Sequence, residues 1–316
     1  MFQNTSLLII AVGTLLTALS TVSQSPAQTK ERLLAILKEV DDATKAHDAD
    51  WLLSLFTEDA LFDVVVIPPM NKEEDRIWIK GYYSSHPSMS LSETFSLVSV
   101  SENVGISEHY LTSVWQDKGI PTSIFHMDIM DFEGDKMKRL TVYADFATEI
   151  IQAGVMPGRN LGDMIPSFNL PDSEKTGLVP LKASEELTAR INAHNLVSLA
   201  KMVRKDADIR FPYIDRPSNR SEFIDIYEQI MAGFPDAQWK TSRKLDMGDG
   251  WVVTEATLKG TNNGLFLGNP ATGLPIEVRA GWIEHYDDKG LAKVLHFHFD
   301  TLTIANQLKG ESSVAN

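Results

Sequence analysis

The sequence predicts an α+β protein made of two tandem domains, each with helices packed on a curled antiparallel sheet. Three observations predict this fold class. The chain has 316 residues, more than a single small domain usually contains. Each half opens with apolar residues at helical spacing and continues with strand-like runs. A stretch rich in glycine and proline, residues 153–182, separates the two halves.

The first half is expected to begin with helix over residues 30–56, with a second short helix from residue 50. Leu33, Leu37 and Val40 recur there at helical spacing. Residues 59–66 have strand character and end at a pair of prolines, and residues 81–86 fit helix or turn. The next runs predict four strands, at 94–101, 104–116, 121–132 and 138–146. A short helix is expected at 147–153.

The second half repeats this order. Apolar residues between 183 and 203 recur at helical spacing, and residues 206–213 predict a strand. Ser221 is a plausible N-cap for a helix over 221–232. Four more strands are expected at 238–246, 250–260, 275–286 and 292–300.

Matching residues indicate that the halves are an internal repeat. Ala46-His47-Asp48 and Ala193-His194-Asn195 each stand 13 residues before an Asp-Ala pair. Asp145 and Asp300 each stand at the end of the last strand of their half, just before a helix. We therefore expect domains at 30–152 and 183–310, a linker at 153–182 and a tail at 311–316.

Residues 1–27 have the features of a secretory signal peptide. A short polar start precedes an apolar run, and Ser25-Pro26-Ala27 offers small residues for cleavage. The alternative is an uncleaved N-terminal anchor. Either way, we expect the body of the protein to be secreted or periplasmic, with no other membrane contact.

Composition narrows the function classes. The formal charge of −14 disfavours nucleic acid and anionic membrane surfaces as partners. The chain has no cysteine, which excludes disulfides and cysteine-based metal sites. No nucleotide-binding, zinc-protease or serine-hydrolase motif occurs in the sequence.

The last strand, near residues 294–300, carries an unusual polar row. Strict alternation places His296, His298 and Asp300 on one face. Leu295, Phe297 and Phe299 then lie on the other face. The ends of the polar row are roughly 13 Å apart by strand rise, too far to share one ion. We therefore predict no metal site there, with an adjacent pair completed by ligands from elsewhere as the alternative.

The second half resembles the SnoaL-like polyketide cyclases of the NTF2-like superfamily of cone-shaped α+β domains. The resemblance rests on Gly233-Phe234-Pro235-Asp236, Gly260-Thr261-Asn262-Asn263-Gly264, Phe266-Leu267-Gly268, the run from Pro270 to Val278, and Phe299-Asp300-Thr301-Leu302 with Gln307-Leu308. The first half resembles the family only in its architecture, its helix before an Asp-Ala pair and its closing Asp145.

The resemblance implies cofactor-free acid/base catalysis, with Asp300 at the position of the family's acid/base residue. His298 and His296 are expected to assist, and Asp145 and Tyr143 form the equivalent row in the first half. For Asp300 the alternative is an N-cap on a helix starting near residue 302. For the histidines the alternative is hydrogen bonding within the sheet.

Other residues are candidates for substrate contact. Phe211, Tyr213, Trp239 and Trp282 suit an apolar or aromatic substrate, or they belong to the core. His126 and Asp128 share a strand face in the first half and His109 stands on the preceding strand. These three could build a different pocket or a polar sheet face.

Together these features predict an exported cyclase or isomerase acting on a small apolar carbonyl compound. The apolar face with Leu295, Phe297 and Phe299, and its counterpart with Leu140, Val142 and Ala144, should need cover. We expect the two sheets to pack together through these faces as an intramolecular pseudo-dimer. The alternatives are a secreted carrier without catalysis and an epoxide-hydrolase-like enzyme.

Overall fold

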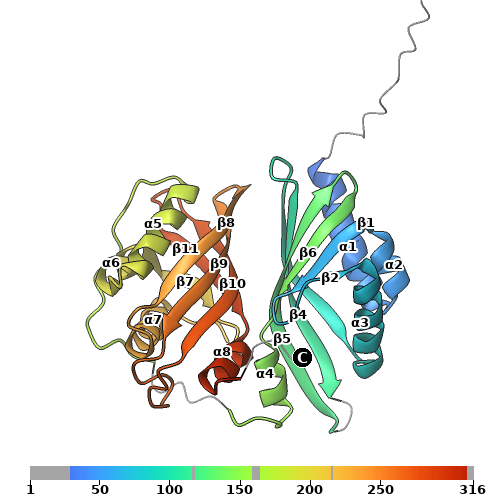
Figure 1. Ribbon diagram of the computed structural model, residues 1–316. Helices are drawn as coiled ribbons and strands as arrows, with labels where there is room; N and C mark the ends of the chain where they lie inside the picture. Colours follow the sequence, from blue (N-terminus) through green and yellow to red (C-terminus); the bar gives the residue numbers. More distant parts are fainter. Residues whose placement is uncertain (1–28, 116–117, 159–163, 215, 312–316) are drawn as a thin grey trace, which may run out of the picture.

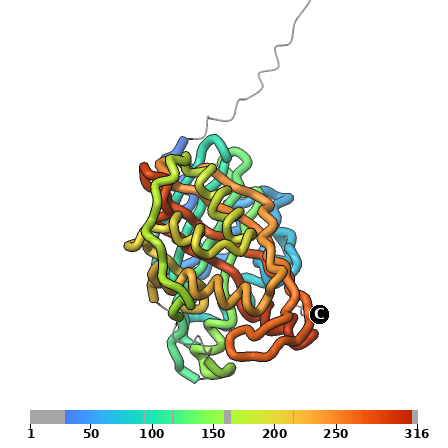
Figure 2. Tube along the Cα trace, turned by 90° about the vertical axis from the view of Figure 1, so that its left-hand side faces the viewer, coloured from blue at the N-terminus to red at the C-terminus, as the bar shows by residue number. Residues whose placement is uncertain are grey.

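The computed structural model describes residues 29–115, 118–158, 164–214 and 216–311. The described chain forms two α+β domains that lie side by side with their sheets facing each other (Figure 1). Helices cover the outer face of each sheet, and a quarter turn brings the C-terminal domain in front of the N-terminal one (Figure 2). The predicted signal peptide, residues 1–27, lies outside the described part of the chain.

The N-terminal domain contains a six-stranded sheet in the order β2-β1-β6-β5-β4-β3. Its elements are α1 (Lys30–Lys45), α2 (Ala49–Ser54), β1 (Phe56–Val64), β2 (Met70–Asn71), α3 (Lys72–Ser85), β3 (Ser90–Ser99), β4 (Val104–Trp115), β5 (Ile120–Glu133), β6 (Lys136–Tyr143) and α4 (Phe146–Gln152). A core of apolar side chains fills the space between its sheet and α1–α3.

The C-terminal domain contains a five-stranded sheet in the order β7-β11-β10-β9-β8. Its elements are α5 (Pro180–Asn192), α6 (Leu196–Lys201), β7 (Val203–Arg210), α7 (Arg220–Gly233), β8 (Gln238–Gly248), β9 (Trp251–Thr261), β10 (Pro275–Tyr286), β11 (Ala292–Phe299) and α8 (Thr301–Leu308). The apolar faces of α5–α7 pack on this sheet.

Each sheet departs from a purely antiparallel meander at one edge. β1 pairs in parallel with β6, and β7 pairs in parallel with β11. Parallel neighbours need a long crossover connection. In each domain that connection includes a helix after the first strand, α3 after β1 and α7 after β7. The sheets are therefore mixed.

The two domains share local geometry at matching positions. His47 and His194 both adopt φ 53°, a left-handed conformation that ends α1 and α5. The next residues, Asp48 and Asn195, are the N-caps of α2 and α6. Each histidine ring bonds a distant carbonyl oxygen, at 3.0 Å and 2.9 Å.

One helix is longer than the sequence pattern predicted. Helix α3 begins at Lys72, well before the expected residues 81–86. Its N-cap, Asn71, forms a reciprocal capping box with Glu74, as Asn219 does with Glu222 on α7. The Asn-x-x-Glu spacing was therefore the signal for this helix start.

The segment between the two domains is irregular but bonded to the C-terminal domain. Between α4 and α5, residues 153–158 and 164–179 contain no helix or strand. Thr176 and Gly177 in this connection donate backbone hydrogen bonds to Lys289 in the C-terminal domain. Among the described helices, none combines the length and apolar content needed to span a membrane.

The inner faces of the two sheets are in contact. A mixed core of apolar side chains joins β4–β6 to β8–β10 and contains Val104, Ile106, Met127, Ile129, Tyr143, Leu245, Met247, Val253 and Ile283. The Arg279 guanidinium binds both carboxylate oxygens of Asp63, at 2.6 and 2.7 Å. The Tyr143 hydroxyl donates to Glu255 at 2.8 Å. The contact between the sheets therefore has both an apolar core and buried polar links.

Candidate functional sites: two cavities and an interdomain network

The two faces of strand β11 point in the opposite directions to those predicted. Leu295, Phe297 and Phe299 point into the C-terminal domain's own core, beneath α7. His296 and His298 instead face the N-terminal domain, where both bind Glu108. The expected pairing of sheets through the phenylalanine face is therefore wrong, and so is the placing of the histidines in the C-terminal pocket.

Glu108 on β4 is the reason for this reversal. Its carboxylate lies 2.8 Å from His296 Nδ1 and 2.7 Å from His298 Nε2, and its side chain is fully buried. Burial alone would raise the pKa of Glu108, but the two imidazoles outweigh it and lower the pKa to about 2. Burial lowers the pKa of His298, whereas Glu108 and Asp208 raise that of His296 against its burial. Two histidines can be buried because a carboxylate from the other domain bonds both.

Asp300 is the N-cap of α8. Its Oδ2 accepts from the Thr303 backbone nitrogen at 2.6 Å, and its Oδ1 is buried without a hydrogen-bond partner in the described structure. Burial, helped by the nearby charge of Asp145, raises the pKa of Asp300 to about 6. Asp145 itself accepts from the backbone and hydroxyl of Thr301, at 2.8 and 2.7 Å. The two carboxylates that close their domains thus lie together at the domain junction.

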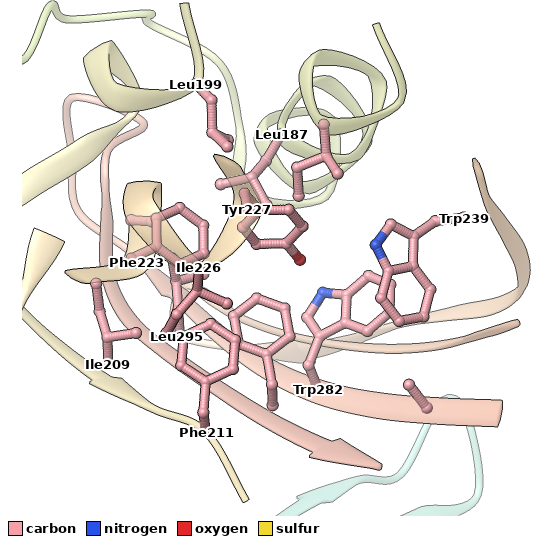
Figure 3. Close-up of a cluster of buried hydrophobic side chains, with 14 of the residues drawn as sticks. Leu187, Leu199, Ile209, Phe211, Phe223, Ile226, Tyr227, Trp239, Trp282 and Leu295 are labelled. Carbon is pink, nitrogen blue, oxygen red and sulfur yellow. The ribbon is translucent and has the colours of Figure 1, made fainter. Parts of the chain in front are cut away.

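The C-terminal domain encloses an apolar cavity of about 380 Å³. Phe211, Tyr213 and Trp239 line it, and Phe297 and Phe299 of β11 form part of its wall. Figure 3 shows Phe211, Tyr227, Trp239 and Trp282 grouped between the sheet and the helices. Ala147 and Ile151 of α4 also line this cavity, so the N-terminal domain completes its wall. Among the described lining residues there is no acid, lysine, arginine or histidine.

Two predicted substrate-contact residues lie elsewhere. Trp282 is buried behind the cavity wall, packs against Trp239 and donates its indole N–H to Glu284 at 2.7 Å. Tyr143 lies on the face of β6 that meets the other sheet. Tyr143 is an interdomain residue because strand alternation turns it away from the cavity of its domain. Trp282 lies on the inward face of β10 but belongs to the core beside the cavity rather than to its lining.

The N-terminal domain has a smaller cavity of about 120 Å³. Leu140, Val142 and Ala144 lie on its wall, so this side of β6 also faces inward rather than the other sheet. Unlike the C-terminal cavity, it is lined by carboxyl and imidazole groups, namely those of Asp41, Asp75, His126 and Asp128. His126, expected to contact substrate, thus lies on a cavity wall.

His109, His126 and Asp128 form a compact buried group beside this cavity. His126 Nε2 lies 3.5 Å and His109 Nε2 3.8 Å from Asp128 Oδ2. One ligand atom from each lies within 4.8 Å of the other two, which is a geometry able to hold a metal ion. Burial acts to raise the pKa of Asp128, but His126 and His109 outweigh it and keep the pKa below its usual value.

Asp41, Asp75 and Glu108 were not singled out from the sequence. Two of them do carry a signal, because Asp41 interrupts the apolar stripe of α1 and Glu108 stands inside a long strand. Their partners, however, are distant in sequence. His109 Nε2 lies 3.6 Å from Asp41 Oδ1, and the histidines bonded to Glu108 are 188 and 190 residues away.

Comparisons with known proteins find a family match in the C-terminal domain. Residues 182–308 match the family model of the SnoaL-like polyketide cyclases. This half of the chain is therefore SnoaL-like, which confirms the resemblance predicted from its sequence. The match does not extend to the first domain. No curated protein sequence matches the chain.

Solved structures resemble parts of the chain at low identity. IdmH from Streptomyces antibioticus is 24% identical, with 41% of this chain and 98% of that chain covered and a TM-score of 0.37. A SnoaL-like protein from Jannaschia sp. CCS1 is 17% identical, with coverages of 44% and 96% and a TM-score of 0.38. AclR from Streptomyces galilaeus is 18% identical, with coverages of 42% and 81% and a TM-score of 0.38. These scores carry no argument about function.

Proposed function

We propose that the protein is a cyclase- or isomerase-type enzyme that acts on a small apolar carbonyl compound bound in the C-terminal cavity. The observation that carries this proposal is the cavity of about 380 Å³ with aromatic walls, in the half of the chain that matches a cyclase family. Enclosed, mostly apolar cavities are the usual binding sites for such molecules.

In this proposal Asp300 transfers the proton. Its neighbours Phe299 and Thr301 line the cavity, and its buried Oδ1 has no hydrogen-bond partner within the described chain. A carboxyl group with a pKa near 6 can both accept and return a proton near neutral pH. The carboxyl would take a proton from the carbon next to the carbonyl group and return it to the new alkoxide oxygen. His298 has no part in this step, because it faces the other domain.

Asp300→Asn tests this role with little risk to the fold. Asparagine caps helices about as well as aspartate, so the bond to Thr303 can persist while the titrating group is lost. Asp48→Asn, at the exposed N-cap of α2, is the matched control. Ala305→Trp places a large side chain on the cavity wall and should block ligand binding.

The experiment begins with thermal shift against aromatic polyketides, terpenoids and steroids, because a ligand that binds the folded state raises its unfolding temperature. We expect a ligand to stabilise the wild type and Asp300→Asn but not Ala305→Trp. Turnover of that ligand should fall about a hundredfold or more in Asp300→Asn and stay unchanged in Asp48→Asn. Undiminished turnover in Asp300→Asn would disprove its role, and no stabilisation by any compound would disprove the cavity's function.

A binding protein without catalysis is the second candidate. It is favoured by the lack of acidic, histidine, lysine and arginine side chains on the described cavity wall and by the capping role of Asp300. A carrier would show the same ligand stabilisation but no product, in wild type and variant alike. Product analysis by mass spectrometry after long incubation separates the two functions.

We also propose that the protein is exported and that its domains are a covalent pseudo-dimer. Residues 1–27 support export through their composition. Expression of the full chain should yield a mature protein that starts near residue 28, as intact-mass measurement can check. Recovery of the chain in the cytoplasmic fraction would contradict export. The contacts between Glu108 and the β11 histidines support the pseudo-dimer.

A further inference from the structure

The N-terminal cavity has ionisable groups that the proposed function does not use. Four buried side chains, Asp41, His109, His126 and Asp128, form what we call the Asp–His cluster. Asp41 comes from α1, His109 from β4, and the other two from β5. His109 and His126 are directly paired across β4 and β5, and their rings stack with centroids 5.2 Å apart. Three separate elements thus bring two imidazoles and two carboxylates to one point.

The fold does not require these groups, as the C-terminal domain demonstrates. Asp145 and Asp300 follow equivalent strands, β6 and β11, so Tyr143 and His298, two residues earlier, are equivalent positions. Tyr143 pairs with Met127 and His298 pairs with Gly281, which makes Met127 and Gly281 equivalent as well. His126 and Asp128 flank Met127, so their counterparts are Ala280 and Trp282. His126 pairs with His109, and Ala280 pairs with Ala256. The same inward positions of the sister domain are therefore apolar and well packed.

Several polar atoms around the N-terminal cavity are unsatisfied. His126 Nδ1 and Asp128 Oδ1 are buried without a hydrogen-bond partner in the described structure. His126 Nε2 and Asp128 Oδ2, at 3.5 Å, are farther apart than a normal hydrogen bond. Asp75, 1% exposed on the same cavity wall, has no partner for either carboxylate oxygen. Buried polar atoms usually find partners, and those left over at one cavity point to a missing ligand.

The rest of the wall is apolar and aromatic, with Phe62, Trp78, Tyr82, Leu91 and Leu140 among its residues. Such a wall selects an apolar molecule, and the Asp–His cluster offers that molecule proton acceptors and donors at one end. We propose that the N-terminal cavity is a second catalytic site, in which the Asp–His cluster moves a proton on a small apolar carbonyl compound.

The reaction class is isomerisation through an enolate, which needs no oxidant, reductant or co-reactant. His126 takes the proton from a carbon next to the carbonyl group, and the C–H electron pair becomes the enolate double bond, with charge on the oxygen. Asp128 stabilises the imidazolium that results. The imidazolium then returns the proton to a carbon of the same molecule, so the product has the same atoms as the substrate.

Proton exchange with solvent tests this site before any natural substrate is known. Cyclohexanone, indan-2-one and 2-tetralone are incubated with the full chain in D₂O, and the loss of their α-proton signals is followed by NMR. We expect the wild type to accelerate exchange of at least one ketone. His126→Gln and Asp128→Asn should each reduce that acceleration by tenfold or more. His285→Gln, outside both cavities, is the matched control and should leave exchange unchanged.

Two further variants make the outcome specific to the site. Val142→Phe narrows the N-terminal cavity and should reduce exchange, whereas Ala305→Trp blocks only the C-terminal cavity and should not. If exchange is lost in Ala305→Trp but kept in the variants of the N-terminal cavity, this inference is overturned while the proposed function stays intact. Undiminished exchange in His126→Gln and Asp128→Asn, or no acceleration with any of the three ketones, would also overturn it.

A metal centre would be a different use of the same residues. Zinc titration by calorimetry on the full chain distinguishes the two. Stoichiometric zinc binding that disappears in His126→Gln would replace proton transfer with metal chemistry and overturn the inference. Exchange that persists in the presence of a strong chelator supports it.

Discussion

At the scale of single residues, the buried carboxylates are the unusual feature of the molecule. Most buried acids here have a partner, as Asp63 has Arg279 and Glu108 has two histidines. Asp75 has none in the described chain, and its burial raises the pKa to about 8. It is therefore protonated at neutral pH and can donate a hydrogen bond into the N-terminal cavity.

Asp75 should make the protein less stable as the pH rises. Its folded pKa of about 8 lies above the ordinary aspartate pKa of 3.8, so the unfolded chain releases the proton first. Stability is then full below about pH 4 and declines as the pH rises toward 8. Asp75→Asn removes this decline, and its stability relative to wild type should increase over the same range.

Urea unfolding at pH 5, 7 and 9 measures the effect. Asp288→Asn, at an exposed turn position, is the control and should show no pH-dependent difference from wild type. An Asp75→Asn variant that follows the wild-type pH profile would show that this carboxyl group does not titrate as described.

At the scale of elements, β11 shows how one strand serves two domains. On one face, Phe297 stacks on Phe211 with ring centroids 4.9 Å apart, and Phe299 makes an edge contact with Tyr213. Its histidines bond Glu108 of the neighbouring domain on the other face. The strand is thus buried on both sides, and alternation alone could not tell which face meets the cavity.

Glu108→Gln should destabilise the protein strongly. Removing one partner of a buried charged group costs about 3–5 kcal/mol, because the remaining groups lose their compensation. The control is Glu58→Gln, whose exposed ion pair with Lys72 should contribute at most about 1 kcal/mol. Chemical unfolding at neutral pH measures both, and a loss for Glu108→Gln no larger than the control would contradict the bridging role.

The Glu108 bonds also predict acid sensitivity. The folded pKa of Glu108, about 2, lies below the ordinary glutamate pKa of 4.5. Its contribution to stability is therefore present above about pH 4.5 and is lost as the pH falls toward 2. The wild type should lose stability over this range more steeply than Glu108→Gln, which unfolding temperatures between pH 2 and 6 can check.

At the scale of the whole molecule, close approach of the two sheets depends on small residues as well as on ion pairs. A Cβ atom on Gly281 would lie 2.3 Å from Met127 Cε and 3.0 Å from two ring carbons of Tyr143. Met127 is flexible, but the ring of Tyr143 is held by its bond to Glu255. Glycine at this position therefore allows the sheets to meet.

Gly281→Ala should weaken the contact between the domains. Overpacking of this kind typically costs about 1–3 kcal/mol. Gly81→Ala, on the exposed side of α3 with open space around it, should instead stabilise by about 0.5–1 kcal/mol. Chemical unfolding followed by tryptophan fluorescence compares the two. Equal stability of Gly281→Ala and wild type would contradict a tight interdomain contact and with it the pseudo-dimer.

The sequence by itself determined the fold class, the helix and strand order and the family of the C-terminal half. Periodicity and turn residues are local, and the Gly-Thr-Asn-Asn-Gly block and the closing Asp300 lie on a continuous stretch of chain. These local patterns can be recognised in the sequence without knowledge of tertiary contacts.

Only the tertiary structure decided which strand faces enclose the cavities. The polar face of β11 is buried against a glutamate 188 residues away, and the apolar face became the cavity wall. In the first domain, Asp41 on a helix meets His109 on one strand, and His109 stacks on His126 of the next. A carboxylate that neutralises a buried imidazole can come from anywhere in the chain, so the partner that makes burial favourable is settled by folding and not by local pattern.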